Sequence, residues 1–362
     1  MKMRVLILSN LASYTYNFRL EIIRAMKEKG WEIVMVFDND SEEKTVVLSE
    51  YGRIMNVPFN GKGTDIREEL KLLGTYRRII RETKPDAVLT FTIKMNLYGG
   101  FAAARKKIPY IPMITGLGEL EKEGKLQKML TAIHKYVMPR AKCVFFQNEA
   151  NIVFFRDKGI RTQKSVLLPG SGVNLEKFKL MPYPPEEEGI SFAFIGRLTQ
   201  AKGIEQYLDV ASNLSALATF YVAGLCDRQY TERVDSMDKK GDIKYLGVLE
   251  DTRPLLEKIS CLVLPTYHPE GMSNVLLEAG ACGRPAICTD RPGCREIVRD
   301  GENGFYCKAK DPEDLQNTVE RFLALDYEEK KKMGARSREI VEKNFDRSIV
   351  VRAYMDELEN LK

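Results

Sequence analysis

Residues 191–203 read SFAFIGRLTQAKG: a short apolar run, a glycine, and a loop that carries Arg197 and Lys202. The run predicts a buried strand, because strands covered on both faces read as continuous apolar segments. Similar runs alternate with longer amphipathic stretches along the whole chain, which predicts parallel sheets joined by crossover helices, an α/β fold. The predicted strands are Val5–Ser9, Glu32–Phe37, Ala87–Phe91, Tyr110–Thr115, Val144–Gln147, Ser191–Ile195, Thr219–Ala223, Ile243–Leu246, Cys261–Leu264, Ala286–Thr289 and Gly304–Tyr306.

The length of the chain sets the number of domains. A single core rarely grows beyond ~250–300 residues, so 362 residues predict two doubly wound α/β domains. Prolines and charges gather at residues 180–189, as they do in exposed linkers. We place an N-terminal domain at residues 1–175, a C-terminal domain at 176–346 and a last helix at 347–362.

Composition and absent motifs exclude several classes of protein. No apolar stretch approaches the ~20 residues of a membrane-spanning helix, and the short apolar start does not fit a signal peptide. Seven cysteines without a Cys-x-x-Cys pair indicate free thiols in a reducing compartment. Only two histidines, His134 and His268, exclude a histidine-rich metal site and disfavour Ser-His-Asp chemistry. Neither a Gly-x-Gly-x-x-Gly motif nor a P-loop is present, which disfavours NAD-dependent dehydrogenases and ordinary ATPases.

Charge is distributed unevenly between the halves of the chain. The net charge is +5, but residues 1–170 carry 29 Lys and Arg against 18 Asp and Glu, a balance of +11. Residues 171–362 carry 27 against 33, a balance of −6. This asymmetry predicts an anionic partner for the N-terminal half, either a membrane surface or a nucleic acid.

Two loops of the second half carry the candidate chemistry. Gly196 ends a strand, and Arg197 and Lys202 follow it at the carboxyl edge of the sheet, where two cations suit a diphosphate. The second loop follows the strand at Cys261 and leads into a helix predicted over Asn274–Cys282 with Ser273 as its N-cap. Its backbone N–H groups would bind an anion; they belong to Gly271, Met272, Ser273 and Asn274.

Two glutamates flank this second turn. Glu278, just over one helical turn in, can accept hydrogen bonds from two ribose hydroxyls, and Glu270 can face a sugar. In the structural alternative, the first loop is a solvated turn and both glutamates only complement the helix dipole. That alternative explains an early glutamate but not a pair that flanks a Gly-Met-Ser turn.

Together these motifs resemble those of the retaining nucleotide-sugar glycosyltransferases of GT-B fold. The resemblance rests on the loop with Arg197 and Lys202, on Glu270-x7-Glu278, on Gly283-Arg284-Pro285, and on residues 292–298 and 300–304. It extends over the N-terminal half to the subset that lengthens polyprenyl-diphosphate-linked sugars, through residues 16–19, 94–96, 116–118, 148–149 and 171–174. It implies two Rossmann-like domains facing a cleft, with the last helix crossing back to the N-terminal domain.

The resemblance also implies roles. Arg197 and Lys202 would hold the donor diphosphate and stabilise its growing charge, Glu270 would contact the donor sugar, and Glu278 would hold the ribose. The other expected donor-binding residues are Gly196, Gly271, Met272, Ser273 and Asn274. No metal and no other cofactor is expected, since the two cations replace Mg²⁺. Asp38-Asn39-Asp40 follows a strand and is expected to cap the next helix, not to bind a metal.

The N-terminal half would then bind the acceptor, a sugar on a polyprenyl diphosphate. Asn17, Arg19, Lys94 and Asn96 follow N-terminal strands and are candidates for holding its diphosphate. Many members of the family carry a histidine near the donor sugar, but the corresponding loop here, residues 114–118, has none. The backbone of Gly116 and Gly118 is the candidate replacement.

A helical stretch at residues 119–142 bears on localisation. Its apolar stripe, surrounded by lysines, fits either a core-facing helix or a helix that lies on a membrane; the stripe consists of Leu126, Met129, Leu130, Ile133 and Val137. With the charge asymmetry, it predicts a peripheral protein whose N-terminal domain docks on the cytoplasmic face of an anionic inner membrane.

The predicted function is transfer of a hexose or N-acetylhexosamine from a UDP-sugar to a polyprenyl-diphosphate-linked sugar in surface polysaccharide or glycan synthesis. Two alternatives remain at this point. A nucleotide-sugar 2-epimerase would need ionisable side chains, histidines included, that are scarce here. A basic nucleic-acid-binding module lacks a recognised motif, and one tryptophan offers little stacking surface.

Overall fold

The computed structural model describes residues 2–59, 66–121, 123–268 and 270–361. The chain forms two compact units, and we describe each by itself. The N-terminal unit comprises Met1–Gly172 and Arg347–Lys362, and the C-terminal unit comprises Val173–Asp346. The division after Gly172 lies three residues before the predicted one, and the proline-rich segment 180–189 belongs to the C-terminal unit.

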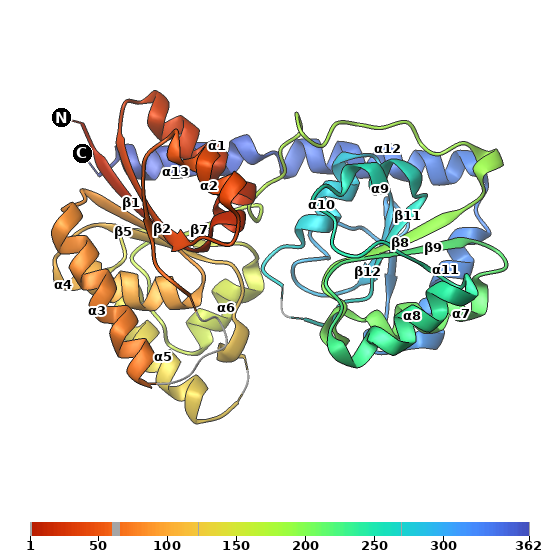
Figure 1. Ribbon diagram of the computed structural model, residues 1–362, viewed down its shortest axis with the longest axis horizontal. Helices are drawn as coiled ribbons and strands as arrows, with labels where there is room; N and C mark the ends of the chain where they lie inside the picture. Colours follow the sequence, from red (N-terminus) through yellow and green to blue (C-terminus); the bar gives the residue numbers. More distant parts are fainter. Residues whose placement is uncertain (1, 60–65, 122, 269, 362) are drawn as a thin grey trace. The chain divides into compact units, whose positions relative to one another are not determined.

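The N-terminal unit is a seven-stranded parallel sheet with helices on both faces (Figure 1). The strand order is β3-β2-β1-β4-β5-β6-β7, and it reverses direction between β1 and β4. The strands are β1 (Arg4–Leu11), β2 (Glu32–Asp38), β3 (Arg53–Asn56), β4 (Ala87–Phe91), β5 (Tyr110–Ile114), β6 (Val144–Phe146) and β7 (Ser165–Leu167).

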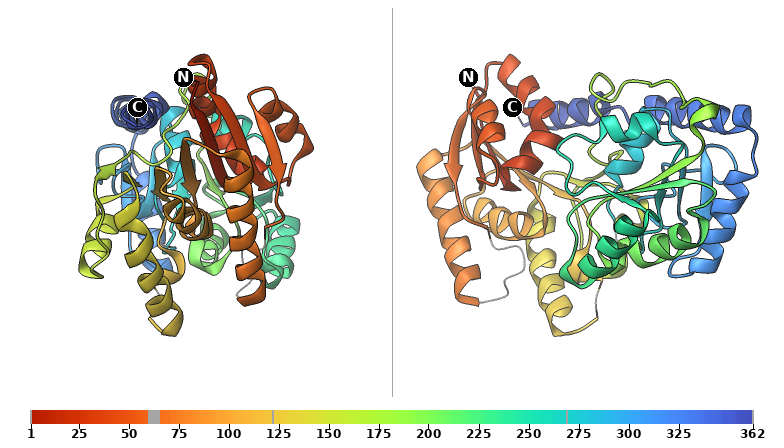
Figure 2. Two further views of the ribbon diagram at one scale, coloured as in Figure 1. Left: turned by 90° about the vertical axis from the view of Figure 1, so that its left-hand side faces the viewer. Right: turned by 45° about the vertical axis from the view of Figure 1, so that its right-hand side comes forward.

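Two separate cores cover the two faces of this sheet. Along β1, Val5 and Ile7 pack into one core while Leu6 and Leu8 pack into the other. Successive side chains of a strand point to opposite faces, so this strand is buried on both sides. The first core is closed by α1 (Ala12–Glu28), α2 (Glu42–Ser49) and α13 (Arg347–Glu359), with α13 packed beside α1 (Figure 2). The second is closed by α3 (Ile66–Thr83), α4 (Gly100–Arg105), α5 (Lys125–Val137) and α6 (Glu149–Asp157).

The C-terminal unit repeats this scheme with six parallel strands. Their order is β10-β9-β8-β11-β12-β13, with the reversal between β8 and β11. The strands are β8 (Ser191–Ile195), β9 (Thr219–Ala223), β10 (Lys244–Tyr245), β11 (Cys261–Leu264), β12 (Ala286–Thr289) and β13 (Gly304–Cys307). Figure 1 shows one face covered by α7 (Ile204–Leu214), α8 (Thr231–Lys240) and α11 (Pro312–Leu323), and the other by α9 (Arg253–Lys258), α10 (Asn274–Ala281) and α12 (Tyr327–Asn344).

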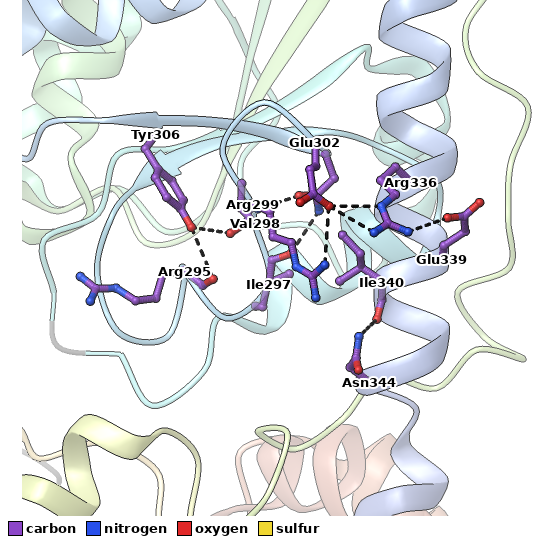
Figure 3. Close-up of polar contacts among 11 residues, drawn as sticks. Arg295, Ile297, Val298, Arg299, Glu302, Tyr306, Arg336, Glu339, Ile340 and Asn344 are labelled. Atoms are coloured by element: carbon purple, nitrogen blue, oxygen red, sulfur yellow. Dashed lines mark hydrogen bonds and ion pairs between the residues drawn. The ribbon is translucent and has the colours of Figure 1, made fainter.

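The segment between β12 and β13, part of the family resemblance, builds the sheet. The Asn303 side chain accepts a hydrogen bond from the Arg299 backbone N–H at 2.7 Å and donates one to the Ile297 carbonyl at 3.1 Å. Figure 3 shows the neighbouring contacts, in which Glu302 pairs with both Arg299 and Arg336 of α12. A Cβ on Gly304 would lie 1.9 Å from the Ala286 carbonyl oxygen, so only glycine fits at this strand pairing. These residues therefore hold β13 beside β12.

A buried arginine holds the segment around residue 181 to the core of the C-terminal unit. Arg284 is 1% exposed, and its guanidinium donates hydrogen bonds to six backbone carbonyls. The acceptors belong to Met181, Pro182, Leu256, Glu257, Cys282 and Gly283, and the shortest distance is 2.6 Å, to Leu256. Burial lowers the pKa of this group below its ordinary value.

The chain passes between the units twice, at residues 172–173 and 346–347, and the two passages lie side by side. Val173 pairs with Asp346 in a parallel bridge, and its N–H donates to the Phe345 carbonyl at 2.8 Å. Gly172 has φ +65°, and a Cβ there would lie 2.5 Å from the Cα of Arg347. Arg347 donates to the carbonyls of Gly172 and Asn17 and pairs with Glu21 at 3.0 Å.

The apolar stripe of α5 belongs mostly to the core. Leu130 and Val137 are buried, and Leu126 and Ile133 pack against them, whereas Met129 is 53% exposed. Of the two alternatives that the sequence left open, the structure therefore supports the core-facing helix for four of the five side chains. Among the described residues, no helix is long and apolar enough to cross a membrane.

Candidate functional site

The candidate site lies where the strand order of the C-terminal unit reverses, between β8 and β11. Open α/β sheets bind ligands beyond the carboxyl ends of the strands at such a point. The two predicted loops follow these two strands, and they are hydrogen-bonded to each other: the N–H groups of Tyr267 and His268 both donate to the Ala201 carbonyl, at 2.9 and 2.8 Å. Gly203 has φ +80°, and a Cβ there would lie 2.2 Å from the Pro265 carbonyl oxygen. The loops therefore form one rigid surface.

Three glycines end adjacent strands at this edge. Gly196 follows β8, Gly224 follows β9, and Gly247 comes two residues after β10. The Gly224 N–H donates to the Gly247 carbonyl at 2.7 Å, and a Cβ on Gly224 would lie 1.8 Å from the Gly196 oxygen. Close packing of the backbone requires glycine at Gly224, whereas the missing side chains of Gly196 and Gly247 leave partly exposed backbone that a ligand can approach at this glycine edge.

Two of the three predicted catalytic side chains meet here. The Lys202 ammonium forms an ion pair with the Glu270 carboxylate, and the side chains are only 18% and 15% exposed. Gly293 packs directly against Glu270, since a Cβ added to Gly293 would lie 2.6 Å from the Cβ of Glu270. Arg197, on the same loop as Lys202, is exposed. The site thus combines a partly shielded ion pair with one cation that faces solvent.

The turn before α10 uses Ser273 differently from the prediction. Ser273 is the N-cap residue of α10, but its hydroxyl makes no capping hydrogen bond. Its backbone N–H donates to the Gly293 carbonyl at 2.9 Å, so this amide is not available to an anion as expected. The Gly293 N–H donates in turn to Glu296 at 2.7 Å, which fixes the loop that supports the turn. Gly271 and Met272 are buried beside it, and Asn274 is half-buried.

Glu278 is half-buried one turn into α10. Its Oε2 accepts a hydrogen bond from the hydroxyl of Thr252, the N-cap residue of α9, at 3.2 Å. Thr252 lies in another loop, and no sequence motif pointed to it. Nor did a motif point to three exposed apolar side chains that follow β9 and β10 at the same edge of the sheet: Leu225, Leu246 and Val248.

The predicted acceptor-binding residues are less accessible than expected. Asn96 is buried; it accepts from the Thr90 hydroxyl at 2.7 Å and donates to the Met113 carbonyl at 2.8 Å. Arg19 is also buried, over the Phe91 ring and 3.1 Å from the Ser171 hydroxyl, and burial lowers its pKa to about 10. It remains charged at neutral pH. Both side chains are thus part of the packed interior.

The remaining N-terminal candidates lie in different settings. Asn17 is half-buried at the point where Arg347 bonds its carbonyl. Lys94 pairs with Glu69 of α3 at 2.6 Å. Gly118 has φ +49° and lies against Ile93, and Gly116 precedes it in extended backbone.

The structure also shows the positions of Asp40 and His134. Ser41, and not the acidic stretch before it, is the N-cap of α2, while Asp40 accepts a hydrogen bond from the Ser13 N–H in α1 at 2.9 Å. His134 is buried in α5 against the Leu130 carbonyl, and burial lowers its pKa to about 4. His134 is therefore neutral and sits in the core.

The site can hold an anion and a polyhydroxyl group together. Lys202 and Arg197 offer charge to a diphosphate, and the glycine edge lets it approach the backbone closely. Glu270 and Glu278 offer acceptors to sugar hydroxyls. Among the described residues, no three His, Cys, Asp or Glu side chains gather as a metal site would require.

Comparisons with known proteins agree with this geometry. The family described as "Glycosyl transferases group 1" matches residues 189–324, and "Glycosyl transferase 4-like" matches residues 4–148. The chain is 26% identical over 339 residues to the N,N'-diacetylbacillosaminyl-diphospho-undecaprenol alpha-1,3-N-acetylgalactosaminyltransferase of Campylobacter jejuni, covering 89% of each. It is 24% identical over 305 residues to the UDP-Gal:alpha-D-GlcNAc-diphosphoundecaprenol alpha-1,3-galactosyltransferase of Escherichia coli, covering 78% of each.

The fold has solved relatives as well. HepE of Anabaena, crystallised with UDP, superimposes with a TM-score of 0.78 at 16% identity, covering 99% of this chain and all of that one. Its likeness shows the fold alone. Because the two family matches together cover most of the chain and lie on either side of the predicted boundary, we conclude that the protein is a glycosyltransferase of GT-B fold, with a "Glycosyl transferase 4-like" N-terminal part and a "Glycosyl transferases group 1" C-terminal part.

Proposed function

We propose that the protein transfers a sugar from a UDP-sugar to a sugar linked to a polyprenyl diphosphate, with retention of the anomeric configuration. The observation that carries the proposal is the Lys202–Glu270 ion pair beside the glycine edge at the switch point, with Glu278 in the next helix. The printed names of two relatives, one from Campylobacter jejuni and one from Escherichia coli, describe such acceptors, which supports the substrate class. Both are transferases, which disfavours the epimerase.

Binding of the donor would change the ionic partner of Lys202 from Glu270 to the diphosphate. Its diphosphate, approaching the glycine edge, competes with Glu270 for Lys202, and exposed Arg197 can add a fork of donors. As the bond from the anomeric carbon to the leaving phosphate oxygen breaks, these cations stabilise the charge that grows on the diphosphate. The acceptor oxygen forms the new bond, and its proton passes to the leaving phosphate oxygen. Once Lys202 has bound the diphosphate, and before the bond breaks, Glu270 would be released to contact the donor sugar.

The nucleoside would lie further along the same edge. Glu278, held by Thr252, can accept from the two ribose hydroxyls. The exposed side chains of Leu225, Leu246 and Val248 offer an apolar surface to the base, since apolar groups gathered at a binding edge commonly mark a ligand.

We expect transfer in the presence of excess EDTA. The test supplies GlcNAc-diphosphoundecaprenol and, in turn, UDP-glucose, UDP-galactose, UDP-GlcNAc and UDP-GalNAc, with products identified by mass spectrometry and their anomeric configuration by NMR coupling constants. One donor should be used with retention, and chelation should leave the rate unchanged because Lys202 and Arg197 supply the positive charge. UDP release that does not require the acceptor would contradict the proposed function. Loss of transfer in EDTA that Mg²⁺ restores would contradict only the absence of a metal.

Glu278→Gln should weaken UDP binding by about tenfold or more, the loss of a hydrogen bond to a charged acceptor. Isothermal titration with UDP and with 2′,3′-dideoxy-UDP separates a ribose contact from a general effect. The wild type should prefer UDP, and the variant, whose neutral amide is a weaker acceptor, should show a smaller preference. Glu257→Gln, at an exposed position of α9, is the control and should behave as wild type. An unchanged preference in the Glu278 variant would remove the ribose role.

The acceptor implies a membrane, and we place the protein on the cytoplasmic face of an anionic inner membrane. Support comes from the outer face of α5, where Met129 and Tyr136 are exposed among Lys125, Lys128 and Lys135. The residues are spaced along one side of the helix, as in surface-bound amphipathic helices. This face replaces the buried stripe as the predicted contact.

Replacing Lys125, Lys128 and Lys135 together by Gln should reduce binding to anionic vesicles by about a hundredfold, at roughly 1 kcal/mol for each lysine. Flotation with phosphatidylglycerol vesicles at low and high salt measures it, and high salt should release the wild type. The matched control replaces Lys239, Lys240 and Lys244, which are exposed in the C-terminal unit. Equal losses in both triple variants would indicate diffuse charge and not a docking face.

A further inference from the structure

A cavity lined by both polar and apolar side chains opens in the N-terminal unit at the carboxyl ends of β2, β3 and β4. Its volume is about 500 Å³, within the range of sites for small ligands. The walls come from residues after these strands and from one side of α3. The lining residues are Asp38, Asn56, Val57, Pro58, Phe59, Glu68, Glu69, Lys71, Leu72, Thr75, Arg78 and Lys94.

The chemistry of this lining matches a sugar better than a diphosphate. Three carboxylates stand against three cations, so the walls carry no excess positive charge. Lys94, the cation expected to hold a phosphate, is already paired with Glu69 at 2.6 Å, and both side chains are less than a fifth exposed. Carboxylates, an amide and a threonine hydroxyl offer hydrogen bonds to hydroxyl groups, while Phe59 and Leu72 offer apolar surface to the face of a ring.

The carboxylate of Glu69 has an oxygen available to a donor. Oε1 accepts from Lys94, whereas Oε2 is buried and meets no donor at hydrogen-bond geometry among the residues described. Tyr98 lies beside this carboxylate: after the larger effect of burial, a hydrogen bond with Glu69 raises the pKa of the Tyr98 phenol. A buried carboxylate oxygen without a full set of donors is costly, and a ligand hydroxyl would relieve that cost.

The backbone beside the cavity is strained. Thr92, two residues before Lys94, has φ +73°, a left-handed conformation that a β-branched residue rarely adopts. One turn of π-helix follows at Met95–Gly99. Strained residues and π-helical turns persist mainly where function requires a particular placement of side chains. Here the strain lies two residues before Lys94, at the strand-order reversal between β1 and β4.

We infer that this cavity binds the acceptor's sugar ring, with the Glu69 carboxylate, fixed by Lys94, accepting hydrogen bonds from its hydroxyl groups. The inference rests on the proposed function for the identity of the acceptor. It moves Lys94 from a phosphate contact to a residue that positions Glu69. The diphosphate would then be held outside the cavity.

The test uses two variants of the full chain. Glu69→Gln keeps the shape of the side chain and removes its charge, and Thr75→Phe fills the cavity without disturbing the ion pair. Each should raise KM for the lipid-linked acceptor by about tenfold or more, with KM for the UDP-sugar and the affinity for UDP unchanged. Glu28→Gln, exposed at the end of α1 on the opposite face of the sheet, is the matched control. Melting temperatures of all three show whether each variant is folded.

A direct measurement separates this inference from the proposed function. Saturation-transfer NMR with the methyl glycoside of N-acetylglucosamine should detect binding to the wild type and to Glu28→Gln, and not to Thr75→Phe. If no UDP-sugar is transferred but this pattern of binding holds, the cavity stands and the proposed function fails. If transfer occurs while both cavity variants keep the wild-type acceptor KM, or raise the donor KM equally, the inference is overturned. Sugar binding retained by Thr75→Phe would overturn it as well.

Discussion

Lys202→Ala should lower kcat by about a hundredfold to a thousandfold, equivalent to about 2.7–4 kcal/mol, the usual loss on removing one electrostatic contact to a developing negative charge. The measurement is the transfer rate at saturating donor and acceptor. Lys239→Ala, exposed at the end of α8, should keep the wild-type rate.

The ion pair complicates this variant, because Lys202→Ala leaves Glu270 partly buried without its cation. The double variant Lys202→Ala/Glu270→Gln separates stability from catalysis. It should recover the melting temperature of the wild type while kcat stays low. If kcat recovered together with the melting temperature, Lys202 would serve only to balance Glu270, and its role at the diphosphate would be refuted.

Arg284→Met should destabilise the C-terminal unit by about 3–5 kcal/mol. It keeps apolar volume but removes the donors to six backbone carbonyls, three of them in fully buried hydrogen bonds, and each buried acceptor left unpaired carries a desolvation penalty. For a unit of this size the melting temperature should fall by roughly 10 °C or more, measured by scanning calorimetry. Arg284→Lys, which has fewer donors than the wild type, should have a melting temperature between those of the wild type and Arg284→Met. Arg295→Met, at a half-exposed position, should change little.

Proteolysis distinguishes the proposed cause from general unfolding. Because Arg284 holds the carbonyls of Met181 and Pro182, the variant should be cleaved near these residues under native conditions before the rest of the unit. Cleavage at the same rate as in the wild type, together with an unchanged melting temperature, would show that water replaces the guanidinium at little cost.

The alternation of apolar and amphipathic segments was sufficient to predict both sheets and to place the two candidate loops at the carboxyl edge of the C-terminal sheet. Strands buried on both faces carry their signal in a few consecutive residues, as β4 and β8 do. The edge strands β3 and β7 escaped prediction because they are short and partly exposed. The meeting of Lys202 with Glu270 follows from topology, since their loops leave the two strands that flank the reversal.

Burial and tertiary pairing were not predictable from local sequence. Arg19 and Asn96 have polar side chains of the kind that often bind ligands, yet both are in the packed interior. The partner of Lys94 comes from α3, 25 residues earlier in the chain, and no spacing rule connects them. The stripe of α5 has the same helical period whether it faces a core or a membrane, and only the neighbouring helices and strands decide between the two.

The two adjacent passages of the chain make the C-terminal unit an insertion within the N-terminal one. During synthesis, residues 173–346 are complete and can fold while the N-terminal unit still lacks α13. Until that helix leaves the ribosome, the core residues that contact Val350, Tyr354 and Leu358 stay uncovered. The first half to be translated is therefore the last to mature, and a nascent chain stalled before residue 347 exposes an apolar sheet face to chaperones.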